Sequence, residues 1–567
     1  MTRSADAVDS DVQALRRRAE QWLADDPDPA TRAELRAVLD GLPGTRDDLA
    51  DRFAGPLTFG TAGLRGPLRA GPNGMNLAVV RQAAAGLMAW LDAQETAGSR
   101  PVVIGYDARH GSRAFALETA KVAAGAGRPA LLLPGPLPTP VLAFAVRHLD
   151  ASAGVMVTAS HNPPQDNGYK VYLGGGLGGP GGDGAQIVPP ADREIEAAIR
   201  AVGPLSAVPL GTGYSIVDRD VLESYVDAAV RVLDRTIVDE SYRSGLTIAY
   251  TALHGVGTAV VGAAFVRAGF APLVVVPEQA EPDPDFPTVA FPNPEEPGAI
   301  DLLLRTAAAA GADLAIANDP DADRCAVAIP TARGWRMLRG DELGVLLADH
   351  LMRRGARGCF ATTIVSSSML RAICAARGVA YAQTLTGFKW IVRASADQLA
   401  YGYEEALGYC VAPDLVRDKD GITAALLVAE LAAGLKAELR TLGDRLDDLA
   451  REFGVFATDQ VSIRVERLAQ IDELMASLRD RPPSSLVDEP VTQVEDLAPR
   501  ADVVTVRTAN VRVVARPSGT EPKLKIYLEV REPVHGDADL RPAQERAAAT
   551  LVALRTEFLT LVNSTVG

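Results

Sequence analysis

The sequence predicts a multidomain α/β protein, with three α/β domains followed by a C-terminal α+β domain. Its 567 residues exceed what one hydrophobic core accommodates, and this length suggests about four domains. Hydrophobic residues make up 47% of the chain, which also contains 51 Gly and 38 Pro, as is typical of globular proteins with many turns. Short apolar runs alternate with helical patterns through the middle of the chain, and this alternation indicates largely parallel sheets.

The N-terminal region is predicted to be helical over residues 12–53, because Leu15, Ala19 and Leu23 recur at helical spacing. An Asp-Pro break interrupts this pattern at residues 26–29. We then expect strands at residues 102–106, 130–133, 154–157, 247–250, 273–276, 314–317 and 362–365. Between them we expect helices at residues 78–94, 262–268, 300–310 and 341–352.

The last part of the chain has an α+β pattern. We expect strands at residues 455–465, 503–507, 512–515 and 525–530, and helices at residues 468–478 and 542–561. The predicted order is therefore an N-terminal helical extension, three α/β domains and a C-terminal domain, over residues 1–39, 40–210, 211–330, 331–445 and 446–567. Two unusual segments are expected to be surface loops: the glycine-rich residues 174–184 and the proline-rich, acidic residues 277–298.

Charge and cysteine usage exclude several classes of protein. With 57 Lys and Arg against 72 Asp and Glu, the net charge of −15 disfavours nucleic acid and anionic membranes as partners. The four cysteines contain no Cys-x-x-Cys pair, so we expect reduced thiols. No signal peptide is visible at the N-terminus, and prolines interrupt the long uncharged stretch at residues 129–146. These features predict a soluble, cytoplasmic protein.

The sharpest local signal is an acidic loop directly after the strand expected at residues 314–317. Asp319, Asp321 and Asp323 stand at alternate positions and can converge on one hard divalent cation. Arg324 and Pro330 occupy the places where an EF-hand needs Gly and Glu, which excludes that class. Three protein oxygens would leave Mg²⁺ open positions for water and a phosphate oxygen. The alternative is an acidic turn that caps the next element.

A second candidate is Ser160, in the Thr-Ala-Ser-His-Asn-Pro segment at residues 158–163. This serine follows an expected strand, so it is either a nucleophile or the capping residue of an Asn-Pro turn. The adjacent His161 is directed wrongly for a conventional base unless the loop is tight. Lys170, ten residues further on, is equally ambiguous by itself.

Other loops offer cations and hydroxyls to an anionic ligand. The Arg-Pro-Ser-Gly-Thr-Glu-Pro-Lys segment at residues 516–523 has what a phosphate dianion requires, or it is an ordinary β-turn. A glycine loop at residues 59–66 presents Arg65. Lys389 and Glu404 could bind sugar hydroxyls, although such loop residues are common. Gly174, Gly176 and Gly179 match a dinucleotide-binding pattern, but two prolines follow where a helix is required, which excludes that site.

Taken together, these motifs resemble the α-D-phosphohexomutase superfamily. Four of them occur in the family order: Thr-Ala-Ser-His-Asn-Pro at 158–163, Asp-Pro-Asp-Ala-Asp-Arg at 319–324, Gly-Tyr-Glu-Glu at 402–405 and the segment at 516–523. The resemblance covers about residues 50–530. Residues 57–65, 286–296 and 384–390 are similar to the phosphoglucomutase/phosphopentomutase branch, which includes bacterial phospho-sugar mutases.

The resemblance implies four domains around a central cleft, three of them with mixed sheets, and a reaction in two phosphoryl transfers. Ser160 would be the phosphoserine and would share Mg²⁺ with the three aspartates of the acidic loop. Arg65 and Arg324 would stabilise the phosphoryl group in transfer, and Lys170 would exchange a proton with the sugar hydroxyl. Lys389 and Glu404 would contact the sugar. The residues that would hold the non-reacting phosphate are Arg516, Ser518, Gly519, Thr520 and Lys523.

The first expectation is a phosphoglucomutase that interconverts glucose 1-phosphate and glucose 6-phosphate through glucose 1,6-bisphosphate. Mannose, pentose or broad specificity stays open, because Ala406 stands where many hexomutases have Ser. A Mg²⁺-dependent sugar phosphatase and a non-catalytic sugar-phosphate sensor are alternatives of other classes. Sugar phosphates are the expected partners, and the protein is expected to be a monomer or a homodimer.

Overall fold

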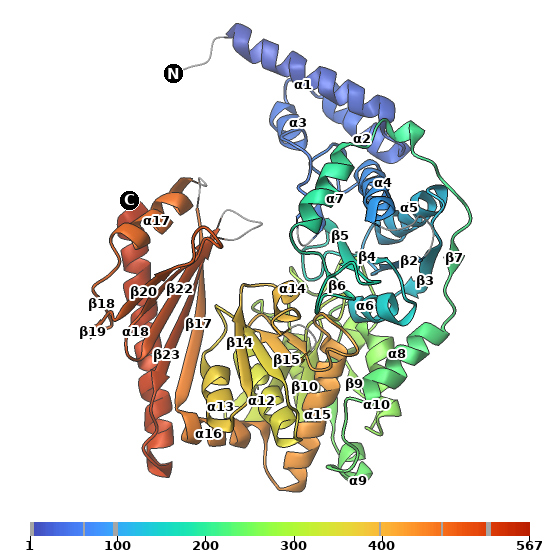
Figure 1. The fold of residues 1–567 in the computed structure, drawn as a ribbon. Helices are drawn as coiled ribbons and strands as arrows, with labels where there is room; N and C mark the ends of the chain where they lie inside the picture. The colour runs from blue at the N-terminus through green and yellow to red at the C-terminus, as the bar shows by residue number, and fades with distance from the viewer. Residues whose placement is uncertain are drawn as a thin grey trace. The chain divides into compact units, whose positions relative to one another are not determined.

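The computed structural model describes residues 5–60, 63–94, 100–395, 398–465, 469–517 and 523–566, whose elements are labelled in Figure 1. The chain divides into two compact units. The first unit comprises Met1–Leu338 and Phe388–Gly434, and the second comprises Arg339–Gly387 and Leu435–Gly567. Within the described ranges, no helix combines the length and the apolar character that crossing a membrane requires.

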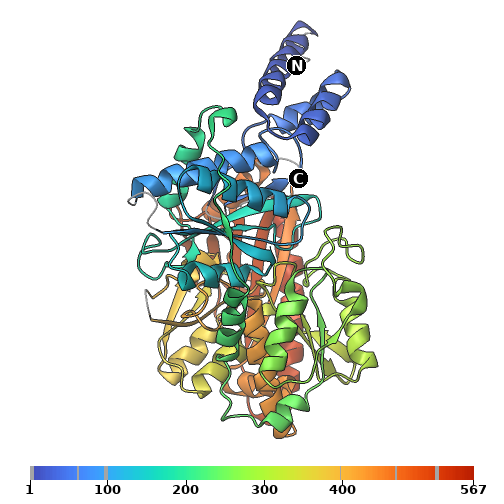
Figure 2. The same ribbon diagram turned by 90° about the vertical axis from the view of Figure 1, so that its right-hand side faces the viewer.

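The first unit begins with the expected helical segment, drawn in blue in Figures 1 and 2. It consists of α1 (Ala5–Asp25), α2 (Pro29–Asp40) and α3 (Arg46–Arg52). The break before α2 arises because Pro29 starts the helix and Asp28 caps it by accepting a hydrogen bond from the Ala30 amide. Leu35 and Leu49 are fully buried in the small core between the three helices.

A mixed sheet follows, in the order β1-β5-β4-β2-β3-β7, with β6 paired to β5. Its strands are β1 (Leu64–Pro67), β2 (Val102–Tyr106), β3 (Ala130–Pro136), β4 (Ala153–Val157), β5 (Asp166–Leu173), β6 (Ala185–Gln186) and β7 (Ser215–Ile216). β4, β2, β3 and β7 are parallel, whereas β5 runs antiparallel to β4 and β1. The strands expected at residues 102–106, 130–133 and 154–157 are confirmed as β2, β3 and β4.

Helices cover both faces of this sheet. They are α4 (Leu77–Gln94), α5 (Ser112–Gly125), α6 (Thr139–His148) and α7 (Ala191–Arg200), and the short η1 (Leu205–Ala207) follows them. In Figure 1, α4, α5 and α7 lie on one face and α6 on the other. The parallel crossovers from β2 to β3 and from β3 to β4 run in opposite directions along the sheet, so their helices α5 and α6 lie on opposite faces.

The second sheet of this unit has the order β12-β11-β10-β8-β9. Its strands are β8 (Ile248–Thr251), β9 (Val274–Val275), β10 (Leu314–Ala317), β11 (Ala326–Thr331) and β12 (Gly334–Met337). Its helices are α8 (Asp220–Val230), α9 (Glu240–Ser244), α10 (Gly257–Arg267), η2 (Pro277–Gln279) and α11 (Asp301–Ala309). The unit is completed by α14 (Phe388–Ile391), β15 (Leu399–Glu404), β16 (Gly408–Cys410) and residues 421–434 of α15 (Gly421–Ala437).

The second unit contains the parallel pair β13 (Cys359–Thr363) and β14 (Ala380–Thr384), with α12 (Gly340–Arg353), α13 (Met369–Arg377) and α16 (Leu442–Phe453). β13 begins and ends earlier than the strand expected at residues 362–365. A five-stranded antiparallel sheet follows, formed by β17 (Val455–Arg464), β23 (Lys523–Glu532), β22 (Val511–Pro517), β21 (Val504–Arg507) and β20 (Gln493–Asp496). The β18 (Ser485–Leu486) and β19 (Glu489–Pro490) strands form a separate hairpin.

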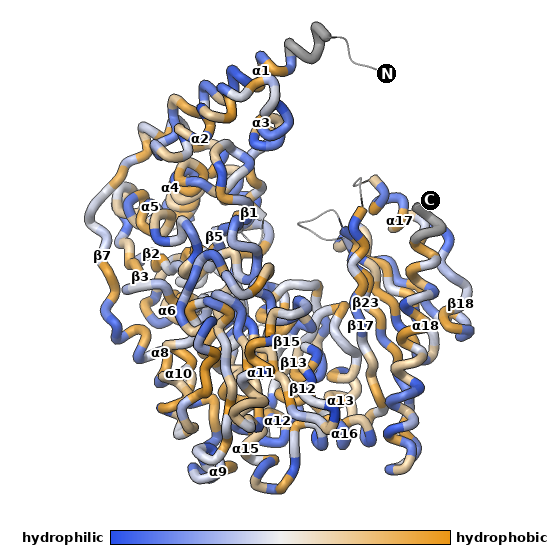
Figure 3. The backbone as a smooth tube through the Cα atoms, turned by 180° about the vertical axis from the view of Figure 1, so that it is seen from behind, coloured by the Kyte–Doolittle hydropathy of each residue, from blue (hydrophilic) through white to orange (hydrophobic). Residues whose placement is uncertain are grey.

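The antiparallel sheet packs against α17 (Ala469–Asp480) and α18 (Leu540–Val566), and η3 (Asp537–Asp539) precedes α18. The buried residues of α18 recur at helical spacing and include Ala543, Ala547, Leu551, Leu554 and Phe558. Hydrophilic and hydrophobic residues accordingly alternate along α18 in Figure 3. This amphipathic pattern is why the helix forms one layer over the sheet.

Candidate active site

The loop after β4 places Ser160 in a strained, tightly held conformation. Ser160 has a φ of 52°, in the left-handed region that a residue with a side chain rarely adopts. Its amide donates a hydrogen bond to Thr158 Oγ1 (2.9 Å), and its Oγ donates to Asp319 Oδ2 (2.7 Å). His161 Nδ1 lies 3.0 Å from Ser160 Oγ. The loop is therefore tight, which is the condition under which His161 can face the serine, and the two side chains are in contact.

Arg109, in the turn after β2, holds the backbone of this loop, and the sequence did not single it out. Its Nη2 donates to the Ser160 carbonyl at 2.6 Å and to the Asn162 carbonyl, and its Nη1 donates to the Pro163 carbonyl at 2.8 Å. The side chain is buried beside Asp107 (Nε to Oδ2, 3.5 Å). The only available signal was its place at the end of a predicted parallel strand, where functional residues gather in α/β folds.

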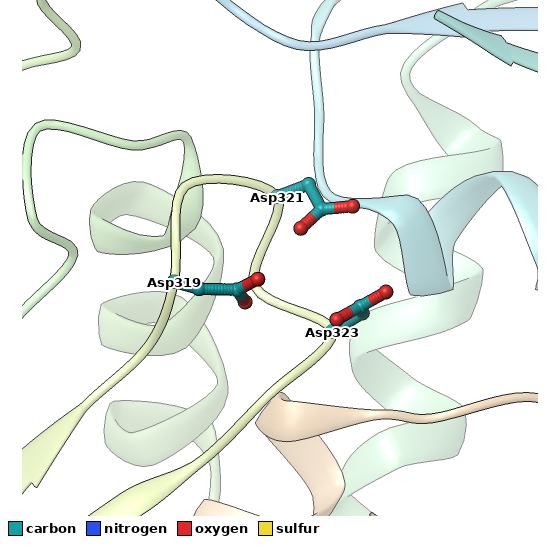
Figure 4. A group of neighbouring side chains, drawn as sticks. All are labelled: Asp319, Asp321 and Asp323. Carbon is teal, nitrogen blue, oxygen red and sulfur yellow. The ribbon is translucent and has the colours of Figure 1, made fainter. Parts of the chain in front are cut away.

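The acidic loop between β10 and β11 brings the three predicted carboxylates together, as Figure 4 shows. Asp319, Asp321 and Asp323 are fully buried, and one oxygen of each lies within 4.8 Å of one oxygen of the others. Within the described part of the chain, Asp321 Oδ1 and Asp323 Oδ1 are buried without a hydrogen-bond partner. Such unpaired buried oxygens are costly, so this donor set fits a hard divalent cation.

Positive side chains surround these carboxylates. Lys170, on β5, donates from Nζ to Asp321 Oδ2 (2.8 Å) and Asp323 Oδ2 (3.0 Å). Lys419, in the loop before α15, lies 3.2 Å from Asp323 Oδ2, and the sequence had not indicated it. Arg324 Nε is 3.9 Å from Asp319 Oδ2. The acidic loop is therefore ion-paired by two other segments of the first unit and by its own Arg324.

The three carboxyl groups differ in their ionisation because their neighbours differ. Burial, together with the charges of Asp321 and Asp323, raises the pKa of Asp319 well above its usual range. Burial also acts to raise the pKa of Asp323, but the positive charges of Lys170 and Lys419 outweigh it and hold that pKa low. Asp319, the carboxyl that contacts Ser160, is thus the one whose charge is least compensated by protein cations.

Arg65 lies beside the serine loop. It is on β1, where it pairs with Gly168 of β5, and its Nη1 donates to Asn162 Oδ1 (3.2 Å). Burial lowers its pKa; the charges of Asp321 and Asp323 act to raise it, and those of Arg324 and Arg109 act to lower it further. The structure therefore brings Arg65 and Ser160 to one end of the first sheet, although residues 61–62 of the glycine loop lie outside the described residues.

The two expected sugar-binding residues lie in neighbouring segments of the first unit. Lys389 is on α14, and Glu404 ends β15. Arg324 donates from Nη1 to the Ala406 carbonyl (3.1 Å) and forms a β-bridge with Gly408, so the acidic loop and the Glu404 loop are joined. Burial lowers the pKa of Lys389 to about 8. The acidic loop and the loop after Glu404 therefore form one continuous site.

Comparison with known proteins decides the family. Residues 56–204, 223–334 and 339–453 match Phosphoglucomutase/phosphomannomutase, alpha/beta/alpha domains I, II and III, and residues 463–540 match its C-terminal domain. The chain belongs to the α-D-phosphohexomutase superfamily. It is a phosphomutase, an enzyme that moves a phosphoryl group within a sugar phosphate, and it has three α/β/α domains with mixed sheets and an antiparallel C-terminal domain.

Two relatives and one solved structure illustrate the similarity. A "Probable phosphomannomutase" of Haemophilus influenzae is 45% identical over 82% of this chain and 95% of that protein. The "Phosphopentomutase" of Mus musculus is 34% identical over 95% of this chain and 93% of that protein. A phosphoglucomutase/phosphomannomutase family protein of Burkholderia thailandensis has the same fold, with a TM-score of 0.64 and 20% identity over 88% of this chain and 97% of the other.

The residues of this phosphomutase that were expected to hold the non-reacting phosphate are in the second unit. Arg516 is near the end of β22, where its Nη2 donates to Tyr527 Oη (3.3 Å), and Lys523 begins β23. Ser518, Gly519 and Thr520 lie outside the described residues. The phosphate-binding role of this segment stays a prediction.

Proposed function

We propose that this phosphomutase interconverts the 1-phosphate and 5-phosphate of a pentose, with ribose as the reference sugar. Ser160 would carry the phosphoryl group, and a sugar bisphosphate would be the intermediate. The observation that carries this chemistry is the 2.7 Å contact between Ser160 Oγ and Asp319 Oδ2 at the edge of a buried carboxylate cluster. A serine held against three carboxylates suits a phosphate that shares a cation with them.

The reaction would proceed in two transfers. In the first, the bond between phosphorus and Ser160 Oγ breaks as a bond to the free sugar hydroxyl oxygen forms, and Lys170 exchanges the hydroxyl proton. The bisphosphate then presents its other phosphate: the bond between that phosphorus and the sugar oxygen breaks as a bond to Ser160 Oγ forms, the sugar oxygen takes a proton through Lys170, and the isomeric monophosphate leaves. Asp319, Asp321 and Asp323 would hold Mg²⁺, which would supply neutralisation of the phosphoryl charge. Arg65 and Arg324 orient the phosphoryl oxygens.

The sugar preference follows from the Glu404 loop. Ala406 is half-buried, and its methyl group cannot hydrogen-bond a sugar hydroxyl. A loop with one hydroxyl fewer is suited to a sugar with one hydroxyl fewer, and a site that leaves a substrate hydroxyl unpaired discriminates against it. The phosphopentomutase of Mus musculus, which is similar over 95% of this chain, supports the same choice.

Mannose 1-phosphate is the second candidate substrate, because the relative at 45% identity is named a probable phosphomannomutase. The glucose preference that the motifs first suggested has less support than either. In each case trace glucose 1,6-bisphosphate would act as the priming bisphosphate, since it can phosphorylate Ser160. The monomeric or homodimeric state stays a prediction.

The proposal is tested by incubating the purified protein with Mg²⁺ and trace glucose 1,6-bisphosphate, and following three separate substrates by ³¹P NMR. These are ribose 1-phosphate, mannose 1-phosphate and glucose 1-phosphate. We expect ribose 5-phosphate to form with the largest kcat/KM. A larger kcat/KM for a hexose would overturn the pentose preference, growth of inorganic phosphate would make the protein a phosphatase, and no change in any tube would favour a sensor.

A further inference from the structure

The glycine-rich insert at residues 174–184 is tied to the segment that carries Lys389. Arg393, two residues beyond α14, donates from Nη1 to the Lys389 carbonyl (2.8 Å). Its Nη2 donates to the Gln186 carbonyl (3.0 Å) and reaches the Gly178 carbonyl (3.4 Å). One guanidinium group therefore spans the insert, the strand that follows it and the backbone of Lys389.

This arrangement corrects the expectation that the insert is a plain surface loop. Gly181, Gly182 and Gly184 are buried, whereas Gly176 and Gly179 are exposed. The insert therefore has one buried edge, where Gly182 faces Arg393 and Gly184 faces Arg147. The expectation holds for the exposed part of this loop and fails for the buried part, because a run of glycines carries no hydrophobic pattern from which burial can be predicted.

We propose that Arg393 and the glycine-rich insert position Lys389 and thereby set how tightly the phosphomutase binds its sugar phosphate. The inference rests on the sugar-binding role proposed for Lys389. Arg393 does not touch the substrate in this proposal; it is a positioning residue that acts through the Lys389 backbone.

The glycines at the buried edge leave no space for side chains. A Cβ at Gly182 would lie 2.5 Å from Arg393 Nη2 and 2.6 Å from Arg393 Nε, and it would also collide with the Gly178 carbonyl oxygen. The same holds for Gly178, because a Cβ added there would collide with the Gly182 carbonyl oxygen. Only glycine lets the two turns of the insert close on each other while Arg393 reaches between them.

The insert is also joined to the carboxylate cluster. Gln186, two residues after the insert, donates from Nε2 to Asp418 Oδ2 (2.7 Å), which also accepts a hydrogen bond from Tyr172 Oη (2.8 Å). Asp418 Oδ1 lies 3.6 Å from Lys419 Nζ, which pairs with Asp323. Polar contacts therefore connect the insert to both the sugar-binding lysine and the acidic loop.

The charged groups around Lys389 make the pKa of this lysine a second, independent readout of the proposal. Burial lowers its pKa to about 8; Asp192 on α7 and Glu404 on β15 act to raise it, and Arg393 acts to lower it further. The Trp390 ring also lies near its ammonium group (5.9 Å). Removing the Arg393 charge should therefore raise the pKa of Lys389, whereas replacing Arg393 by lysine should leave it near 8.

The test compares three variants with the wild type: Arg393→Met, Arg393→Lys and Gly182→Ala. Arg393→Met removes the hydrogen bond to the Lys389 carbonyl, Gly182→Ala displaces the guanidinium group, and Arg393→Lys keeps the charge without the fork that reaches all three carbonyls. We therefore expect KM for the sugar monophosphate to rise about tenfold, the equivalent of one lost charge-assisted hydrogen bond, with kcat within about twofold. The alkaline limb of kcat/KM should move upward in Arg393→Met but not in Arg393→Lys. Gly203→Ala is the matched control, because no atom lies within 4 Å of a Cβ built there.

Hydrogen exchange of the sugar-free protein tests the inference by a measurement that does not depend on enzymatic activity. Backbone amides of residues 388–395 should exchange faster in the three variants and at the wild-type rate in the Gly203→Ala control. Unchanged exchange together with an unchanged KM would overturn the inference. A fall in kcat as large as the rise in KM, in every variant, would also overturn it. If Gly182→Ala fails to fold, the Arg393→Lys result decides. If the wild type converts no sugar phosphate, the proposed function fails, and the exchange experiment judges the positioning role alone.

Discussion

Replacing Arg109 by lysine should impair phosphoryl transfer while leaving a folded protein. Arg109 is 4% exposed, and its guanidinium group donates to backbone carbonyls of the serine loop, including those of Ser160, Asn162 and Pro163. Lysine keeps the positive charge beside Asp107, but a single ammonium group cannot reach acceptors spread along this loop. The left-handed Ser160 conformation would then lose the contacts that hold it.

The magnitude follows from the number of bonds that are lost. If lysine retains one of the contacts to the Ser160, Asn162 and Pro163 carbonyls, two charge-assisted hydrogen bonds disappear, each worth about 1.5 kcal/mol. A loss of about 3 kcal/mol in the positioning of Ser160 corresponds to a fall in kcat of roughly 100-fold. The assay is kcat at saturating sugar phosphate, combined with the phosphorylated fraction of Ser160 from intact-protein mass spectrometry and with thermal melting.

Arg113→Lys is the matched control, because Arg113 is exposed on α5, four residues along the chain from Arg109. It should leave kcat and the melting temperature at their wild-type values. The reasoning is refuted if Arg109→Lys keeps kcat within about threefold of the wild type. It is equally refuted if kcat falls only in proportion to the folded fraction, since Arg109 would then serve stability alone.

Three further predictions address the site directly. Ser160→Ala should abolish turnover and leave the melting temperature unchanged within a few degrees; measurable turnover would remove Ser160 as the phosphoryl carrier. Asp321→Asn should cut the Mg²⁺-dependent rate by about two orders of magnitude or more, because a cation loses a charged ligand, and a Mg²⁺ titration of the rate that matches the wild type would contradict the metal site. The kcat/KM of the wild type should fall as the pH rises through about 8, because Lys389 loses its charge there and the neutral amine binds sugar hydroxyls more weakly. Lys389→Met should have a low kcat/KM without that alkaline limb; a limb that persists in this variant belongs to another group.

Local sequence patterns were sufficient to predict an element that forms an uninterrupted apolar run. β2 and β10 are uninterrupted apolar runs buried on both faces, and both were expected at their observed positions. β5 was missed, because its buried residues include Asn167 and Lys170, whose polarity breaks the hydrophobic run. Burial of these polar groups is stabilised by partners elsewhere in the fold, which a local pattern cannot reveal.

The sequence by itself determined the family and the identity of most candidate residues, because four motifs occur in order and each carries its own chemistry. The tertiary structure decided which of these residues meet. Lys170 and Asp321 are 151 residues apart in the chain and 2.8 Å apart in space, and Tyr172 bonds Asp418 across 246 residues. Arg109, Lys419 and Arg393 became visible only there, because their role depends on the backbone and carboxylates that they contact. A sequence motif identifies which chemical groups are present, whereas the packing of distant segments determines which charges face each other.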